Sequence, residues 1–475
     1  MALPGTPLPA TPLPATPLPG TPPQSPARGQ VFRYAGYATD PATATLSCHY
    51  ELDGREFTEH VTLPGQKGNP RWHTEAAQAA ARLLFLLAGV SYYKTAAPPV
   101  IDLGETALTA PEETFLRDFY LHGLGEFAYR NNLDLTSLRL EAQRAPAQAP
   151  VPSTPPAHHR NHALVPFGGG IDSIVTVEQV RQNADVALFV VSRPGDLFDA
   201  IEEPAAVTGL PIVRAEREID PQLLRSAELG FLNGHVPVTG ILSAIAILAA
   251  VLEDRDAVVM SNEWSASVPT LEYQGRPVNH QYSKSEEFEA AFRNVLKATP
   301  GPMPEYFSWL RDRTELWVGQ EFAKLTPYHS TFRSCNKAFY TERARRFTYW
   351  CGECDKCAFI DLILAPFLPA DALRQIFAVT GEPLENTSVT GKFRSLLGAA
   401  AKPFECVGEV TECRAAALLA ARRADRDPRT NPRLLTVLAA EVRTWPDAPS
   451  AAEVEAMLRP VGRNFIPNEY RDAGS

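Results

Sequence analysis

Apolar and polar residues alternate near the start of the globular part of the chain, and this pattern predicts a β-hairpin. Every second residue from Leu46 to Leu52 is apolar, and further apolar positions recur from Phe57 to Leu63. Asp53-Gly54 lies between the two runs, and this dipeptide is typical of a type I′ turn. Helical periodicity follows across residues 74–90 and 112–131. We therefore expect a small N-terminal α+β unit.

The middle of the chain alternates between strand-like and helix-like segments. These segments are residues 163–167, 174–181, 186–191, 238–252 and 257–260. Such alternation predicts a parallel sheet flanked by helices. From about residue 361 onward the pattern is mostly helical. The expected fold class is therefore α/β, with a helical C-terminal region.

Composition divides the chain further. The first residues repeat a Pro-rich unit of five residues four times, which is typical of a disordered tail with polyproline II character. A second stretch rich in Pro, Ala and His carries no hydrophobic period and is typical of a linker. The predicted units are a tail (1–29), an N-terminal α+β domain (30–142), a linker (143–162), an α/β domain (163–375) and a helical region (376–475).

The net charge limits the partners that we expect. The 475 residues carry a net charge of −10, with a sequence pI near 5.6, which argues against a broad basic surface and against nucleic acid as a partner. No basic segment followed by an apolar core marks a signal peptide. The apolar runs at 77–90 and 240–252 are shorter than the roughly 20 residues that a bilayer span needs. We expect a cytoplasmic protein without a membrane span.

A glycine-rich loop follows the strand predicted at residues 163–167. The loop reads Gly168-Gly169-Gly170-Ile171-Asp172-Ser173 and precedes a predicted helix. Three glycines let backbone N–H groups close around an anion, and the helix N-terminus adds further donors, so the loop can hold pyrophosphate oxygens. The lysine of a Walker loop and the spacing of a dinucleotide fingerprint are both missing. A turn that merely joins a strand to a helix, with Asp-Ser as an N-cap, is the alternative.

The loop resembles the PP-loop, which is usually written Ser-Gly-Gly-x-Asp-Ser. Gly168 stands at the first Ser, while the remaining positions match. The resemblance implies cleavage of ATP between its α and β phosphates, with Mg²⁺ placed in part by Asp172 and phosphate bound by Ser173. Glu263 follows a predicted strand that ends at Met260, so it is either a second Mg²⁺ ligand or a surface acid.

Three of the seven cysteines form a Cys-x₂-Cys-x₂-Cys motif. The motif consists of Cys351, Cys354 and Cys357, and Cys335 lies upstream at a distance that a loop can close. Four thiolates satisfy a tetrahedral zinc ion, so structural Zn²⁺ is the first interpretation. An iron–sulfur cluster and a site without metal are the alternatives. For the three remaining cysteines, buried packing is the default.

Two families resemble the chain beyond the loop. A PP-loop followed by this cysteine motif is similar to the 7-cyano-7-deazaguanine synthases, but those enzymes start close to their PP-loop. A more particular resemblance runs from about Val31 to Cys413. Its most distinctive segments are residues 89–94, 120–131, 232–239, 261–268, 278–285 and 402–409. These segments resemble the UDP-N-acetylmuramoyl-L-alanyl-L-glutamate epimerases of the MurL type.

That resemblance implies an ATP-dependent epimerase for peptidoglycan precursors. The implied reaction converts the terminal L-glutamate of UDP-MurNAc-L-Ala-L-Glu to D-glutamate, with ATP consumed to AMP and pyrophosphate. Activation as an acyl adenylate makes the α-proton acidic enough for an ordinary side-chain base. Another adenylating synthase, such as one like the 7-cyano-7-deazaguanine synthases, is the alternative function.

The reaction needs proton carriers and cations that bind the anionic substrate. The candidate proton carriers are His235, His280, Tyr282 and Lys284, with Cys335 added only if it binds no zinc. The candidate substrate-binding cations are Lys94, Arg130, Arg311 and Lys402. Structural histidines and solvated surface charges are the corresponding alternatives.

Overall fold

The computed structural model describes residues 28–145, 161–426 and 433–471. Nearly all of the predicted Pro-rich tail (1–29) lies outside the described residues, as does most of the predicted linker (143–162). Among the described residues, no helix has both the length and the apolar character needed to cross a membrane.

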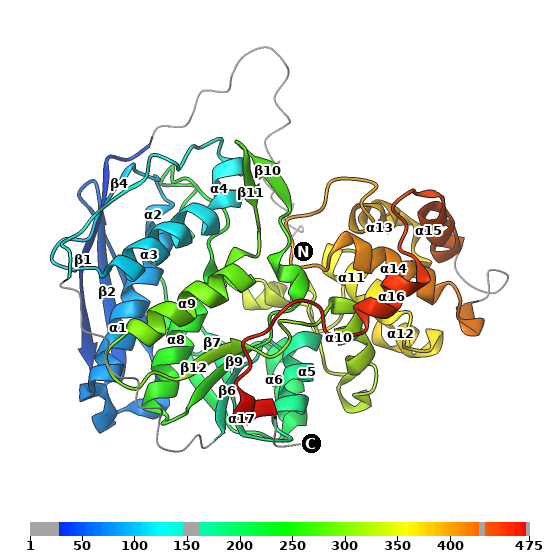
Figure 1. The fold of residues 1–475 in the computed structure, drawn as a ribbon, viewed down its shortest axis with the longest axis horizontal. Coiled ribbons are helices and arrows are strands. Elements are labelled where there is room, and N and C mark those ends of the chain that lie inside the picture. Colours follow the sequence, from blue (N-terminus) through cyan, green and yellow to red (C-terminus); the bar gives the residue numbers. More distant parts are fainter. Residues whose placement is uncertain (1–27, 146–160, 427–432, 472–475) are drawn as a thin grey trace, which may run out of the picture.

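One ten-stranded sheet runs through the larger part of the molecule (Figure 1). Its order is β12-β9-β6-β7-β8-β3-β2-β1-β4-β5. The strands are β1 (Val31–Asp40), β2 (Thr45–Leu52), β3 (Arg55–Thr62), β4 (Val100–Asp102), β5 (Arg139–Glu141), β6 (His162–Pro166), β7 (Asp185–Ser192), β8 (Ile212–Glu218), β9 (Ala257–Met260) and β12 (Glu305–Ser308). All pairings from β12 to β8 are parallel, and those from β8 to β1 are antiparallel. The predicted α/β class is confirmed.

Local sequence signals account for several of these elements. The predicted hairpin is β2–β3, and both residues of its Asp53-Gly54 turn have positive φ, as a type I′ turn requires. A second, two-stranded sheet pairs β10 (Leu271–Tyr273) with β11 (Arg276–Val278). Strands β4 and β5 have three residues each, and the sequence analysis did not predict them.

Helices cover both faces of the parallel part of the sheet, and others form the C-terminal region. The helices are α1 (Glu75–Ala88), α2 (Val90–Tyr93), α3 (Ala110–Gly123), α4 (Gly125–Arg130), α5 (Ile171–Val180), α6 (Asp199–Thr208), α7 (Pro221–Leu224), α8 (Val238–Leu252), α9 (Glu286–Ala298), α10 (Glu315–Phe322), α11 (Asp355–Leu364), α12 (Ala370–Ile376), α13 (Thr390–Leu396), α14 (Val410–Ala420), α15 (Arg433–Thr444), α16 (Ala451–Met457) and α17 (Asn468–Arg471). The helical patterns predicted at 74–90 and 112–131 correspond to α1, α3 and α4.

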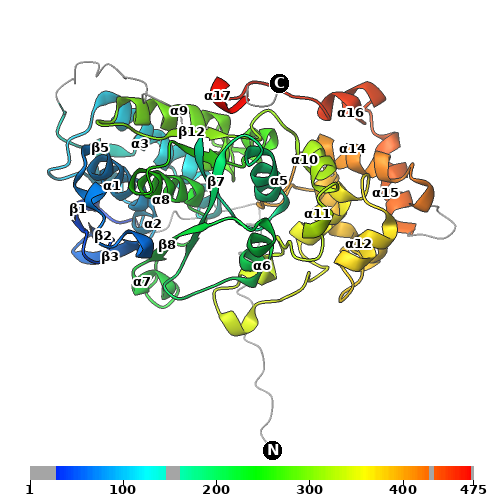
Figure 2. The ribbon, with the colours of Figure 1, turned by 90° about the horizontal axis from the view of Figure 1, so that it is seen from below.

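Two hydrophobic cores lie on opposite faces of the parallel strands. Leu164 and Val258 point into one core, which also contains apolar residues of α1, α3, α8 and α9. Their chain neighbours Val165 and Val259 point into the other core, which includes residues of α5, α10, α11 and α14. Figure 2 shows α1 and α8 on one side of β7 and β8, and α5 and α6 on the other. This burial on both faces explains why the strands are continuously apolar rather than alternating.

The sheet continues across the predicted boundary between the N-terminal and α/β units. Strand β3 pairs antiparallel with β8, with Val61 opposite Arg217. The first hydrophobic core likewise combines residues from β1–β3 and α1 with residues from α8 and β9. A change in composition indicated a linker, but no local pattern could indicate that two distant strands pair. The N-terminal segment therefore shares a sheet and a core with the α/β segment.

A buried ion pair crosses the β3–β8 junction. The Glu59 carboxylate is fully buried and accepts hydrogen bonds from Arg217 Nε at 2.8 Å and Nη2 at 3.0 Å. Tyr92 donates its hydroxyl to the same carboxylate at 2.9 Å, and Arg217 also donates to Ser91 Oγ at 3.1 Å. The bidentate ion pair joins β3 to β8, and the bonds from Tyr92 and to Ser91 add α2. Both carboxylate oxygens of Glu59 therefore accept hydrogen bonds.

Replacing Glu59 by Gln should destabilise the protein strongly, because Arg217 would keep its buried charge without a counter-ion. We expect the free energy of unfolding, measured by urea denaturation, to fall by about 3–5 kcal/mol. The matched control is Glu228→Gln, which removes one partner of the exposed Arg225–Glu228 pair and should change it by less than about 0.5 kcal/mol. Equal, small effects of both substitutions would contradict the role assigned to the junction.

Candidate active site

The glycine loop lies at the carboxyl end of β6, in the middle of the parallel strands. The chain leaves β6 through α5 and returns as β7 on one side, while β9 lies on the other side of β6. Connections that diverge in this way leave a crevice beyond the strand ends, where open α/β sheets bind ligands. The predicted loop therefore occupies the position at which a nucleotide site is expected.

Close contacts determine which loop positions must be glycine. Gly169 has φ of +74°, and a Cβ there would lie 2.1 Å from the carbonyl oxygen of Ala200. A Cβ on Gly170 would lie 2.9 Å from Ser334 Oγ, whereas one on Gly168 would meet no atom within 4 Å. Ser173 donates its hydroxyl to the Gly170 carbonyl at 3.0 Å. The backbone at 169 and 170 is thus fixed between two neighbouring segments.

Three carboxylates meet beside the loop. Oxygen atoms of Asp172, Glu263 and Glu315 lie within 4.8 Å of one another. One oxygen of Asp172 and one of Glu315 are buried without a hydrogen-bond partner among the described residues. Burial and the negative charge of Glu263 raise the pKa of Asp172 to about 7, while the Lys356 ammonium opposes that rise. Such a group of oxygen ligands suits a divalent cation.

The sequence analysis identified Asp172 and Glu263 as candidate metal ligands, but it missed Glu315 and a fourth buried carboxyl group nearby. Glu315 begins α10, far along the chain from the loop, and no motif in the sequence indicates it. Glu412, in the first turn of α14, is 1% exposed and accepts a hydrogen bond from the Leu316 amide at 3.2 Å. Burial and the charge of Glu263 raise the pKa of Glu412 to about 8. The site therefore concentrates carboxyl groups that the protein alone does not neutralise.

The four predicted metal-binding cysteines lie together. The sulfur atoms of Cys335, Cys351, Cys354 and Cys357 are within 4.8 Å of one another, and three of the separations are 3.5, 3.7 and 4.0 Å. A tetrahedron with Zn–S bonds of about 2.3 Å has edges of about 3.8 Å, so the donor set fits zinc. All four cysteines are free thiols rather than disulfides.

The cysteine cluster adjoins the glycine loop. Ser334, next to Cys335, contacts Gly170, as described above. Lys356 stands between Cys354 and Cys357 in the motif, and its charge acts on Asp172 and Glu315. The cluster therefore places a cation beside the carboxylates, and sequence reasoning missed Lys356 although it lies inside the motif.

A second group of titratable side chains centres on His280. Its Nδ1 makes a short hydrogen bond with Glu126, a buried residue of α4, and Arg130 donates to the other oxygen of that carboxylate. The ring of His235 lies 4.3 Å from the ring of His280, centroid to centroid. Burial lowers the pKa of His280, but its interactions with Cys406 and Glu126 outweigh that effect and raise the pKa to about 9. Burial and the positive charge of His280 lower the pKa of His235 to about 4.

Lys284 and Cys406 connect the two groups. Lys284 Nζ donates to Cys406 Sγ at 3.4 Å. Burial would lower the pKa of Lys284, but the charges of Cys406, Glu263 and Asp172 raise it. Glu126 and Cys406 both lie in segments that the sequence analysis singled out, but Glu126 was assigned no role there and Cys406 was assigned only to buried packing.

The remaining predicted residues occupy different places. Tyr282 is buried in the first core between His122 and Phe288, with ring-centroid distances of 5.4 and 6.0 Å, and its hydroxyl has no partner among the described residues. Arg311 is 1% exposed and forms an ion pair with Glu289 at 2.8 Å. The structure therefore does not support a substrate-binding role for Arg311. The prediction treated it as a free cation because sequence alone does not reveal a buried partner.

Arg311 instead positions the site. Its guanidinium donates to the carbonyl of Glu263 at 3.0 Å and to the carbonyl of Lys284 at 2.6 Å. Two chain segments that carry candidate site residues are thereby held at a fixed separation. Glu289 completes the arrangement by also accepting the Ser308 amide at 2.8 Å.

Two of the predicted cations, Lys94 and Arg130, lie beside the His280 group, and Lys402 lies four residues before Cys406 in the chain. Lys94 donates to Asn233 Oδ1 at 2.7 Å and to the Gly234 carbonyl at 3.2 Å, next to His235. Arg130 lies over the ring of Phe404 at 4.9 Å. Lys402 is half-buried on the segment that carries Phe404 and Cys406.

Two domain families match the chain in sequence. The MurL N-terminal domain matches residues 23–309, and the MurL C-terminal domain matches residues 331–453. The chain belongs to the MurL family. Curated relatives are named UDP-N-acetyl-alpha-D-muramoyl-L-alanyl-L-glutamate epimerase. The protein from Xanthomonas oryzae pv. oryzae is 40% identical over 400 residues, which cover 83% of this chain and 86% of the relative.

Two more MurL relatives match over most of their length. The proteins from Salinispora tropica and a Micromonospora species are each 37% identical, over 460 and 463 residues. These alignments cover 94% of this chain in both cases, and 96% and 98% of the relatives. No solved structure matches the chain.

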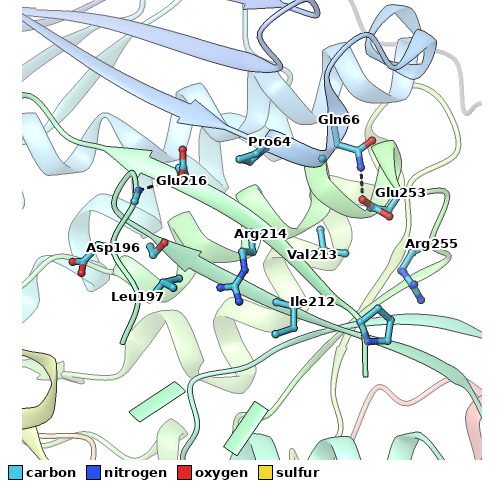
Figure 3. A pocket seen from close by; sticks show the side chains of 14 residues that line it. Pro64, Gln66, Asp196, Leu197, Ile212, Val213, Arg214, Glu216, Glu253 and Arg255 are labelled. Carbon is cyan, nitrogen blue, oxygen red and sulfur yellow. Dashed lines mark hydrogen bonds between the residues drawn. The ribbon is translucent and has the colours of Figure 1, made fainter. Parts of the chain in front are cut away.

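A separate cavity of about 570 Å³ lies along β8 (Figure 3). Arg214 on its wall pairs with Glu202 at 2.7 Å, and Gln66 donates to Glu253. None of the candidate active-site residues lines this cavity. In this member of the MurL family, the glycine loop and the carboxylates beside it lie at the carboxyl end of β6 and not in that cavity.

Replacing Glu412 by Gln should stabilise the protein more at pH 8 than at pH 5. The unfolded carboxyl has a pKa near 4.5 and the folded one about 8, so the folded state loses stability as pH rises between these values. Glutamine cannot ionise and therefore removes that loss. Measured by thermal unfolding without added Mg²⁺, the free energy of unfolding should increase by about 2–4 kcal/mol more at pH 8 than at pH 5. Glu455→Gln, an exposed change on α16, should give the same small effect at both pH values. A gain that did not depend on pH would refute the assignment.

Proposed function

We propose that the protein epimerises the terminal L-glutamate of UDP-MurNAc-L-Ala-L-Glu to D-glutamate, for peptidoglycan precursor synthesis. The observation that carries this proposal is the match to curated epimerases over 83–94% of the chain. Epimerases of this name are isomerases, so the protein is an enzyme of that class. The details of the mechanism below are proposals that rest on the site geometry.

ATP activates the substrate in this proposal, with the glycine loop acting as a PP-loop. Backbone amides of Gly168, Gly169 and Gly170 and the N-terminus of α5 bind phosphate oxygens. Ser173 is close enough to exchange its hydrogen bond with Gly170 for one to phosphate. The close contacts at Gly169 and Gly170 support this role because they fix the loop backbone against Ala200 and Ser334, while the space beside Gly168 is open.

Asp172, Glu263 and Glu315 are the proposed ligands of Mg²⁺. The unpaired buried oxygens of Asp172 and Glu315 support the assignment, because a divalent cation would offset three carboxylates in one place. When bound, Mg²⁺ neutralises charge on the phosphates that are cleaved. Lys356 supplies a further positive charge next to these residues.

Activation is chemically necessary because the α-proton beside a free carboxylate is hardly acidic. Removing that proton would place a second negative charge on the carboxylate, whereas an acyl adenylate has a neutral carbonyl and an electron-withdrawing leaving group. Side-chain groups with shifted pKa values can then exchange the proton. Hydrolysis of the activated carboxyl afterwards restores the free acid.

His235 and His280 are the proposed proton carriers. Their pKa values of about 4 and 9 make His235 neutral and His280 protonated at pH 7, which suits a base and an acid in one site. Lys284 is a further candidate because its ammonium faces the same space. Tyr282 is the least supported of the predicted carriers, since it lies in the apolar core.

The anionic ends of the substrate need cations at the edge of this site. Lys94, Arg130 and Lys402 are the proposed partners for the glutamate carboxylates and the UDP pyrophosphate. Arg130 also lies over Phe404, near the partly exposed ring of Tyr129, and such a surface suits the stacking of a flat base.

Incubation with ATP, Mg²⁺ and UDP-MurNAc-L-Ala-L-Glu should give UDP-MurNAc-L-Ala-D-Glu, AMP and pyrophosphate, and in D₂O the product should carry deuterium at the α-carbon of its D-glutamate. The reason is that an acyl adenylate forms and then exchanges its α-proton with solvent. Chiral chromatography after acid hydrolysis, nucleotide analysis and mass spectrometry measure these products.

Two substitutions and a control sharpen that experiment. Asp172→Ala and Ser173→Ala should lower both the formation of the D-product and the release of AMP by at least about 100-fold. Asp185→Ala lies at the opposite, amino-terminal end of β7 and should leave both activities unchanged. ADP and orthophosphate as primary products, or D-product without α-deuterium, would contradict the proposed route.

We further propose that the cysteine cluster binds one structural Zn²⁺. Elemental analysis of the purified protein should find about one zinc per chain, and Cys354→Ser should lower both the zinc content and the melting temperature. Cys413→Ala removes a thiol that lies outside the cluster, so it should keep the zinc. Iron in place of zinc, or a folded protein without metal, would refute the assignment.

A further inference from the structure

Cys406 is surrounded by groups that favour its thiolate form. Lys284 Nζ donates to its sulfur at 3.4 Å, and the neighbouring His280 imidazole also favours the thiolate. Burial raises the pKa of Cys406, but the charges of Lys284 and Lys356 and the interaction with His280 together lower it to about 6. The sulfur is therefore a thiolate at neutral pH, and thiolates are the reactive form of cysteine.

Cys406, His280 and Glu126 form a relay of neighbouring groups. The Nδ1 of His280 bonds to the Glu126 carboxylate, and its imidazole interacts with the Cys406 sulfur. Arg130 donates to the other oxygen of Glu126, which holds the carboxylate in place. A nucleophile next to a base that a third group orients is the arrangement found in enzymes that form covalent intermediates.

Lys284 links this relay to the carboxylates beside the glycine loop. Its ammonium contacts the Cys406 sulfur, and its charge also acts on Asp172 at the start of α5. Asn336 donates to Glu405 at 3.0 Å and thereby ties the Cys406 segment to the loop of the cysteine cluster, which contacts Gly170. The Cys406 segment is therefore held next to a segment that contacts the glycine loop.

We propose that Cys406 is a covalent nucleophile that takes the acyl group from the adenylate as a thioester; this inference rests on the proposed function. The sulfur attacks the carbonyl carbon, a C–S bond forms, and the C–O bond to AMP breaks. AMP leaves with the electron pair. The thiol proton resides on His280, so this step needs no further proton transfer.

The thioester then serves as the species whose α-carbon is epimerised. A thioester carbonyl is neutral and only weakly stabilised by its sulfur, so its α-proton remains acidic after AMP has left. Water finally attacks the carbonyl, the C–S bond breaks, and the thiolate leaves. Neutral His235 can accept the proton of that water, because its low pKa keeps it unprotonated.

The geometry favours a nucleophile over a second proton carrier. The Cys406 sulfur accepts a hydrogen bond from Lys284 and neighbours the His280 imidazole, which bonds to Glu126. A sulfur beside a cation and an oriented imidazole is the arrangement of an activated nucleophile rather than of a proton carrier on the opposite face of the substrate.

Cys406→Ala and Cys406→Ser test this inference together with the matched control Cys413→Ala, which removes a buried thiol outside the site. Exchange of labelled pyrophosphate into ATP in the presence of UDP-MurNAc-L-Ala-L-Glu measures adenylation alone. Both Cys406 variants should keep this exchange within about threefold and lose D-product by at least about 100-fold. The control should keep both activities.

Direct detection of the intermediate completes the test. Wild-type enzyme quenched in acid during turnover should carry the acyl group on the peptide that contains Cys406, and hydroxylamine should remove it. Normal epimerisation by Cys406→Ala would overturn the inference. Loss of epimerisation in that variant, with no acylated peptide in the wild type at any time, would also overturn it and make Cys406 a proton carrier. Epimerisation by wild type without pyrophosphate exchange would overturn adenylation itself, and the thioester with it.

Discussion

The pairing of β3 with β8 is the contact on which the candidate active site depends, because the site takes residues from both sides of that junction. Glu126 and Arg130 come from α4 in the N-terminal segment, while His280 and Cys406 come from later segments. Register matters here, since a slip by one residue would turn Arg217 to the opposite face of the sheet. The buried Glu59–Arg217 pair opposes such a slip because it is satisfied in one register only.

Charge in the site is divided between two regions that share one lysine. Carboxyl groups gather beside the glycine loop, and imidazoles with a thiol gather beside α4. Lys284 interacts with both, since Cys406, Glu263 and Asp172 all raise its pKa. Its ammonium therefore couples the protonation of the two regions, and Arg311 fixes its backbone through the Lys284 carbonyl.

Local sequence signals predicted the elements and the motifs, whereas contacts between distant segments were out of reach. The hairpin, the strand before Gly168 and the clustering of four cysteines follow from spacing and turn chemistry. Arg311 could not be distinguished from a free cation, because its partner Glu289 lies 22 residues away without any motif. Glu315 was missed for the same reason. Cys406 was assigned to buried packing because a single cysteine carries no spacing signal.

The open space at Gly168 has an evolutionary consequence. No atom lies within 4 Å of a side chain added there, so mutation can exchange this residue without disturbing its neighbours. Position 169 has no such freedom, because both its backbone angle and the Ala200 carbonyl exclude a side chain. The structure therefore tolerates other residues at the first position of the loop, whereas the second position must remain glycine. A search for distant members that demands serine at the first position would pass over chains like this one.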